Sequence, residues 1–290
     1  MKLIHKTAVA AALIASANAF AGITQPDTGD SDIFLVMYNP TNETSFVMDL
    51  GVLSKSFRLL ADINRPAAMP GMGFVGASSG DTKYSRTWGL DETAGTEFAT
   101  FVSNGGSNSD WRWFVTGSDG TGSAQPNNRS IVTTVTKGDT VSLLNSAITN
   151  IGGAGINNFA LAVNATGDAA MMGDAALDGS AYGSKLVGVY AMDENRPFVR
   201  NNGAGQYNFT TDNAITDTSE FFYMARTTTS QIVPAQFDIF NNNNATGKFS
   251  IVQATPGDYS LMYAVPEPST YALLIAGLGL VGFVARRRQA

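Results

Sequence analysis

The sequence predicts an all-β fold for the central part of the chain, built as an antiparallel β-sandwich or jelly roll. Short runs of β-branched and aromatic residues recur along it, and clusters of Gly, Asn, Ser, Asp and Pro separate them. No repeat of fixed period is present. Runs of this kind favour an antiparallel all-β architecture over an alternating α/β one.

Residues 1–21 are typical of a cleavable secretory signal. Lys2 and Lys6 give a positive start, and a short Ala-rich apolar run follows them. Small residues then recur at the spacing that signal peptidase requires, ending at Ala19 or Ala21, and we expect cleavage after Ala21. The apolar run is too short to span a bilayer core of about 30 Å. Signal peptidase is therefore an expected partner, and the exported chain begins near residue 22.

The predicted strands lie between residues 22 and 264, and each is followed by turn-forming residues. Long Gly-, Ser- and Asn-rich stretches at 104–110 and 117–130 are predicted loops. We treat 22–264 as one domain. The predicted strands are 33–38, 45–50, 98–102, 111–116, 131–136, 186–191, 221–225, 237–240, 248–252 and 259–265.

One segment in this region is predicted to be helical. Asp139 is a suitable N-cap, and Gly152-Gly153 is expected to end the helix. A second apolar stretch, 159–163, is compatible with either helix or strand. The first helix is predicted from apolar residues that share one face: Val141, Leu144, Ile148 and Ile151.

The last 26 residues, 265–290, have three parts in order. The motif Val265, Pro266, Glu267, Pro268 comes first, and its prolines impose an extended, non-helical entry. An apolar segment without charge follows at 269–285, which we predict to be a transmembrane helix at the short end of the usual length. Arg286, Arg287 and Arg288 close the segment and are expected to stay cytoplasmic.

This three-part tail resembles the PEP-CTERM sorting signal. The resemblance covers 265–290 and implies that an exosortase, an integral-membrane cysteine transpeptidase, processes the chain near Pro266-Glu267-Pro268. Proteins of this kind occur mainly in Gram-negative bacteria that make exopolysaccharide, so the resemblance implies an envelope or matrix location. A simple tail anchor is the alternative. Residues 22–264 would then be an uncharacterised passenger domain.

Composition excludes several classes of function for this domain. Of the 18 basic residues five lie in the two ends, and of the 24 acidic residues only Glu267 does, which leaves 13 basic and 23 acidic residues, a net charge of -10. An acidic body disfavours nucleic acid as a partner. The chain has no cysteine, and its one histidine, His5, lies in the signal. We therefore expect no triad, thiol nucleophile, cofactor or metal.

Trp111 and Trp113 are two residues apart on a predicted strand, so both rings should face the same side of the sheet. Two alternatives follow: packing in the core, which we favour, or a platform that stacks sugar rings. The leading hypothesis is a non-enzymatic surface or matrix protein associated with exopolysaccharide. The alternatives are a carbohydrate-binding module that uses this pair and a glycan-active enzyme that uses paired carboxylates.

Overall fold

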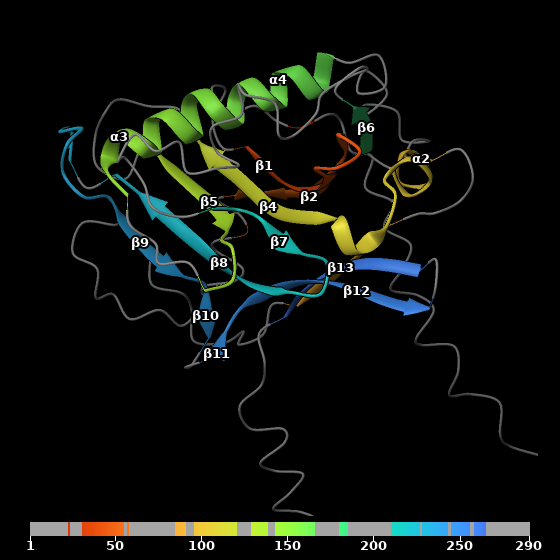
Figure 1. The fold of residues 1–290 in the computed structure, drawn as a ribbon. Coiled ribbons are helices and arrows are strands. Elements are labelled where there is room, and N and C mark those ends of the chain that lie inside the picture. The colour runs from red at the N-terminus through yellow and green to blue at the C-terminus, as the bar shows by residue number, and fades with distance from the viewer. Residues whose placement is uncertain are drawn as a thin grey trace, which may run out of the picture.

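The computed structural model describes a mostly antiparallel β fold with a helical layer on one face (Figure 1). The residues described are 23, 31–54, 57, 85–90, 96–120, 129–138, 143–165, 180–184, 210–226, 228–242, 245–255 and 258–264.

One large antiparallel sheet forms the body. Its strands run in the order β3-β13-β12-β8-β5-β4-β1-β2-β6, with β7 paired to β4 and β9 paired to β8. A separate hairpin joins β10 to β11. The bounds are β1 Asp32–Asn39, β2 Thr44–Leu53, β3 Arg86–Leu90, β4 Arg112–Asp119, β5 Ser130–Thr134, β6 Ser180–Ser184, β7 Asn213–Ala214, β8 Thr218–Ala225, β9 Gln236–Ile239, β10 Asn241–Asn242, β11 Ala245–Thr246, β12 Lys248–Thr255 and β13 Asp258–Ala264.

A continuous helical path covers one face of the sheet (Figure 1). It consists of α3 Asn145–Ile148, the π-helical turn η3 Thr149–Ile156, and α4 Asn157–Ala165. Apolar side chains of these helices pack on β1, β4, β5 and β8 and form what we call the helix-side core. Its members include Phe34, Val36, Phe114, Ile131, Met224, Ile148, Ile151, Phe159 and Val163, all buried.

The helical path comes very close to the sheet at Gly152. A Cβ atom at this position would lie 2.9 Å from Cγ2 of the buried Ile131 and 3.3 Å from Cβ of Ser118. The Ser118 hydroxyl also donates a hydrogen bond to the Gly152 carbonyl, at 3.2 Å. The glycine thus allows a contact that a larger residue would obstruct.

The opposite face of the sheet is buried because the sheet curls on itself. Strands β3, β12 and β13 turn back over β1, β2 and β4, and the enclosed side chains form the inner core. Trp88 on β3 closes the curl, because its indole Nε1 donates to the Leu50 carbonyl on β2 at 2.9 Å. Aromatic rings dominate the inner core, among them Phe46, Phe57, Trp88, Phe98, Phe101, Trp111, Trp113, Phe221, Phe249, Tyr259 and Tyr263.

Helix α2, Glu97–Asn104, covers part of this inner core. The Thr96 hydroxyl accepts a hydrogen bond from the Ala99 amide, and Glu97 lies in the first turn, where a negative charge is favourable. Phe98 and Phe101 are three residues apart, so they lie on the same helix face, and both are fully buried. The 3₁₀ turn η2, Asn108–Asp110, connects α2 to β4.

The mostly antiparallel β class is confirmed. The predicted sandwich or jelly roll is not found: the described strands form one large curled sheet, with a helical layer on one face. The strand predicted at 98–102 is wrong, because the capping Thr96 and the i, i+3 spacing of the phenylalanines produce α2. The predicted helix end at Gly152-Gly153 is also wrong, because η3 continues through both glycines into α4. The stretch 159–163, left open between helix and strand, is helical. The described helix begins at Asn145, and Leu144, predicted on its apolar face, instead forms a β-bridge with Pro234. The predicted N-cap Asp139 and Val141 lie outside the described residues.

Other sequence predictions have mixed outcomes. The runs at 33–38, 45–50, 111–116, 131–136, 221–225, 237–240, 248–252 and 259–265 all overlap observed strands, whereas β3, β6, β7, β10 and β11 were not anticipated. The predicted loop at 117–130 overlaps β4 and β5 at its two ends. The run at 186–191, the signal and the apolar segment 269–285 lie outside the described residues. Every helix within the described ranges falls short of the length and apolarity that crossing a membrane requires.

Replacing Gly152 with Ala should lower the free energy of unfolding by about 1–3 kcal/mol, the usual range for overpacking. The new methyl group would press on Ile131, which is 0% exposed and packed in the helix-side core. Denaturant titration measures the loss. Gly89→Ala is the matched control, since a Cβ at Gly89 meets no atom within 4 Å. Equal stability of the two variants would contradict the close approach of helix and sheet.

Candidate functional site

The candidate sorting motif begins where the folded sheet ends. Strand β13 runs to Ala264 and lies between β12 and β3, with Ala264 opposite Lys248 and Tyr263 opposite Arg86. Tyr263 is fully buried, so the strand is anchored almost to its last residue. The predicted motif, Val265, Pro266, Glu267, Pro268, follows directly but lies outside the described residues, as do Ala19, Ala21, Arg286, Arg287 and Arg288.

The structure places Trp111 and Trp113 together in the inner core. Their exposed fractions are 2% and 0%. Each indole N–H is satisfied by a backbone carbonyl: Trp111 Nε1 donates to Gly105 at 2.9 Å and Trp113 Nε1 donates to Ala214 at 2.8 Å. Trp111 also contacts Phe101 and Tyr259, with ring centroids 4.9 and 5.6 Å apart. A ring stacks on a sugar through an exposed face, and as placed neither ring has one.

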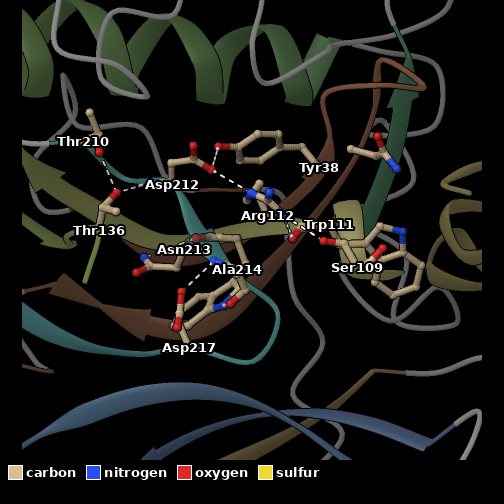
Figure 2. Close-up of polar contacts among 12 residues, drawn as sticks. Tyr38, Ser109, Trp111, Arg112, Thr136, Thr210, Asp212, Asn213, Ala214 and Asp217 are labelled. Carbon is tan, nitrogen blue, oxygen red and sulfur yellow. Dashed lines mark hydrogen bonds and ion pairs between the residues drawn. The ribbon is translucent and has the colours of Figure 1, made fainter. Parts of the chain in front are cut away.

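A polar network at the surface joins segments that are distant in sequence (Figure 2). Asp212, just before β7, accepts a hydrogen bond from the Tyr38 hydroxyl of β1 at 3.0 Å. The same carboxylate oxygen lies 3.4 Å from Nε of Arg112 on β4. The side chains of Arg112 and Asp212 are 30% and 50% exposed, so water reaches the ion pair, whereas Tyr38 is buried. An ion pair this exposed contributes little stability.

The network continues on both sides of β7 along the chain. The Thr136 hydroxyl accepts from the Asp212 amide at 2.7 Å and shares a hydrogen bond with the Thr210 hydroxyl at 2.6 Å. Asp217 accepts from the Ala214 amide at 3.2 Å and lies 3.5 Å from Nζ of Lys137. These contacts hold the 210–217 segment against β4 and present Arg112, Asp212 and Lys137 at the surface. Neighbouring hydroxyl, carboxylate and cationic groups can donate hydrogen bonds to a polar ligand and accept hydrogen bonds from it.

Asp49 is a buried acid whose pKa is raised. It is 2% exposed and lies on β2 opposite Phe34. Its Oδ1 accepts from the Gly51 amide at 2.8 Å, and Gly51 adopts a positive φ of 61° at a bulge in the β1–β2 ladder. Burial, together with the negative charge of Asp32, raises the pKa of Asp49 to about 7. Within the described ranges, no three acidic or histidine side chains group closely enough to hold a metal ion.

Sequence reasoning did not identify the Tyr38–Arg112–Asp212 network. Tyr38 and Asp212 are 174 positions apart, and no local spacing connects them. Asp49 could have been recognised, because Asp followed two residues later by Gly is typical of a turn or bulge in which the carboxylate accepts the glycine amide. Its burial depends on the fold and has no local signal.

Replacing Trp113 with Ala should lower the free energy of unfolding by about 3–5 kcal/mol, the usual cost of removing a buried aromatic ring. Trp113→Phe keeps a ring but removes the donor to Ala214 and should cost about 1–3 kcal/mol, mainly from the unpaired carbonyl. Phe237→Ala is the control, because Phe237 is 40% exposed. Thermal melts measure all three. A Trp113→Ala protein as stable as the wild type would favour the exposed sugar platform instead.

Stability should fall as the pH rises from about 4 to 7, because folded Asp49 binds a proton in this interval that the unfolded chain releases. The full change is on the order of 4 kcal/mol, at about 1.4 kcal/mol for each unit of pKa difference. Asp49→Asn keeps the acceptor for Gly51 and should flatten this dependence, whereas the exposed Asp258→Asn should not. Denaturant titrations at several pH values provide the measurement. A wild-type protein that gains stability over this interval relative to Asp49→Asn would contradict the assignment.

Comparison with known proteins identifies one segment of the chain. Residues 264–288 match the PEP-CTERM protein-sorting motif. No curated protein and no solved structure matches the chain. The matched segment begins at Ala264, the last residue of β13, and contains the proline motif, the apolar segment and the three arginines. The chain therefore carries a C-terminal PEP-CTERM protein-sorting motif, the mark of an exported protein that an exosortase sorts.

Proposed function

We propose that this chain is a non-enzymatic protein of the cell surface or extracellular matrix, delivered to the envelope of a Gram-negative bacterium and associated with its exopolysaccharide. The PEP-CTERM motif at 264–288 is the observation that carries the proposal. The secretory signal predicted at 1–21 agrees with it, because such a signal directs the body across the inner membrane.

In this proposal the tail acts in two ways. The apolar segment 269–285 spans the inner membrane as a helix, with Arg286–Arg288 held in the cytoplasm. The exosortase recognises Pro266, Glu267 and Pro268 on the outer side and cleaves near them. A proline cannot donate a hydrogen bond to a β-ladder, so Pro266 and Pro268 disfavour continuation of β13 through the motif.

The position of Ala264 supports this arrangement. Four residues, 265–268, separate the last strand from the apolar segment. Five steps of at most about 3.5 Å lead along an extended chain from Ala264 to residue 269, so Ala264 would lie within about 18 Å of the start of the apolar segment before cleavage. Cleavage at the motif would leave β13 whole, and the body would keep its fold after release or transfer.

Composition supports a non-enzymatic body. After removal of the signal, and with it His5, the chain contains neither histidine nor cysteine, the side chains most often used as general bases and nucleophiles near neutral pH. Its surface contacts with exopolysaccharide would then be made by neutral polar groups such as the Asn, Ser and Thr side chains in which the body is rich. Co-sedimentation of the mature protein with the producing cell's own polysaccharide tests this association.

Deleting residues 265–290 should change where the protein resides but leave the body folded. The expected result is loss of the membrane-bound precursor and a shift of protein between membrane, surface and medium, measured by quantitative immunoblotting of each fraction. The melting temperature should stay unchanged, because β13 is retained. Intact mass of the wild-type mature protein should show both cleavages, one after Ala21 or Ala19 and one near Pro266–Pro268.

Deleting only Gln289-Ala290 is the matched control, because these residues follow the matched segment. This variant should show the wild-type distribution between membrane, surface and medium. If the 265–290 deletion were distributed in the same way, the tail would have no role in sorting. A wild-type mature mass that still includes 269–290 would instead support a permanent tail anchor.

A further inference from the structure

Two arginines face each other at one end of the sheet, beneath the helical layer. Arg129 precedes β5 and Arg226 follows β8, and these strands pair with Ser130 opposite Ala225. The Arg226 amide donates to the Arg129 carbonyl at 3.3 Å, which continues the ladder by one more pair. Directly opposed residues of an antiparallel pair extend from the same face of the sheet. Ile131 and Met224, two residues further along each strand, both lie in the helix-side core, so this face is the helical one.

Arg226 is buried although it carries a charge. It is 1% exposed. Its Nη2 donates to the Thr229 carbonyl at 2.8 Å and its Nη1 lies 3.4 Å from the hydroxyl oxygen of Thr149, at the start of η3. Both acceptors are neutral, and the buried Nε has no partner. Arg129 is half-buried, and its Nε is likewise buried without a partner. Among the described residues, neither guanidinium forms an ion pair.

This arrangement is unfavourable unless a negative charge compensates it. A buried charge without a counter-charge costs several kcal/mol, and like charges directly opposite each other on a sheet repel. Burial, and then the positive charge of Arg129, lower the pKa of the Arg226 guanidinium. Buried donors without partners commonly mark an ordered water molecule or an ion.

We propose that Arg129 and Arg226 bind a small oxyanion, with a carboxylate, sulfate or phosphate group held between the two guanidinium groups. Each guanidinium is a planar fork whose N–H groups match paired oxygen atoms of such a group. The Thr149 hydroxyl, which accepts from Arg226, helps to hold that guanidinium in place. Because Arg129 is half-buried and Arg226 is not exposed, the anion enters from the Arg129 side. The site is independent of the function proposed above.

The same chemistry has two sources outside the cell: a free inorganic ion, and the acidic group of a polysaccharide. A carboxylate or sulfate at the end of a sugar chain presents the same paired oxygens as the free ion. The experiment therefore uses sodium sulfate as the inorganic probe and an oligosaccharide that ends in glucuronate as the acidic-sugar probe.

The test compares melting temperatures of the mature protein and of its Arg129→Gln variant, with sodium chloride at matched ionic strength as the reference. Sulfate at low millimolar concentration should raise the wild-type melting temperature by roughly 5 °C, since a ligand that binds only the folded state stabilises it by mass action. Arg129→Gln should lose most of this rise. Arg112→Gln removes the same charge at a surface ion pair and should keep it.

The anion-free proteins provide a second readout. Without sulfate, Arg129→Gln should melt at or above the wild-type temperature, because the like-charge repulsion is removed. With sulfate, the wild type should melt at the higher temperature. If the glucuronate oligosaccharide also raises the melting temperature, the site binds acidic sugars as well as the free ion. If only sulfate raises it, the site binds the free ion. Equal shifts in all three proteins would indicate a general salt effect and overturn the site. No shift in the wild type would overturn it also, and would point to a carboxylate of the chain itself as the counter-charge.

Discussion

The structure depends on one constraint: the central strands are apolar on both faces, so both faces must be covered. All eight residues of β1 are buried, and so are the six inner residues of β4. In a strand, alternate side chains point to opposite sides, so one covering layer is not enough. The helices α3, η3 and α4 cover one face, and the curl of the sheet covers the other. Removing water from both faces is the largest favourable term available to such a strand.

Buried indole groups connect the layers that this curl brings together. Trp88, Trp111 and Trp113 each donate the indole N–H to a backbone carbonyl. For Trp88 and Trp113 the acceptor is distant in sequence, and for Trp111 it is Gly105 at the end of α2. A buried ring supplies apolar area, and its N–H requires a partner, so each indole fixes the distance between two segments. The Gly105 carbonyl illustrates this well, because it accepts from both Trp111 Nε1 and Asn39 Nδ2 at the end of α2. A side chain at Gly105 would approach both the Phe101 carbonyl and the Trp111 ring.

The body and the tail meet at a single residue, Ala264. The body has its own two cores, and the tail begins after the last buried residue of β13. This separation fits a protein whose sorting signal is recognised independently of its fold, since the tail can be processed without disturbing a packed strand. The polar groups that the body presents, in the Tyr38–Arg112–Asp212 network and at the paired arginines, arise from strand ends and the segments that flank them. Such positions can vary with little effect on the cores.

The sequence by itself identified the sorting motif at the C-terminus and the β class of the middle of the chain. The order of prolines, apolar segment and arginines is a local pattern, and a sorting enzyme reads it locally, so it can be recognised without a fold. Most strands could also be found, because β-branched and aromatic runs are local signals. The tertiary structure alone decided that the sheet curls, that η3 passes through Gly152-Gly153, and that 98–102 is helical. It also brought Arg129 to Arg226 and Tyr38 to Asp212. The physical reason is that burial and long-range pairing depend on which segments meet, and the energy of those contacts exceeds the local preferences of a few residues.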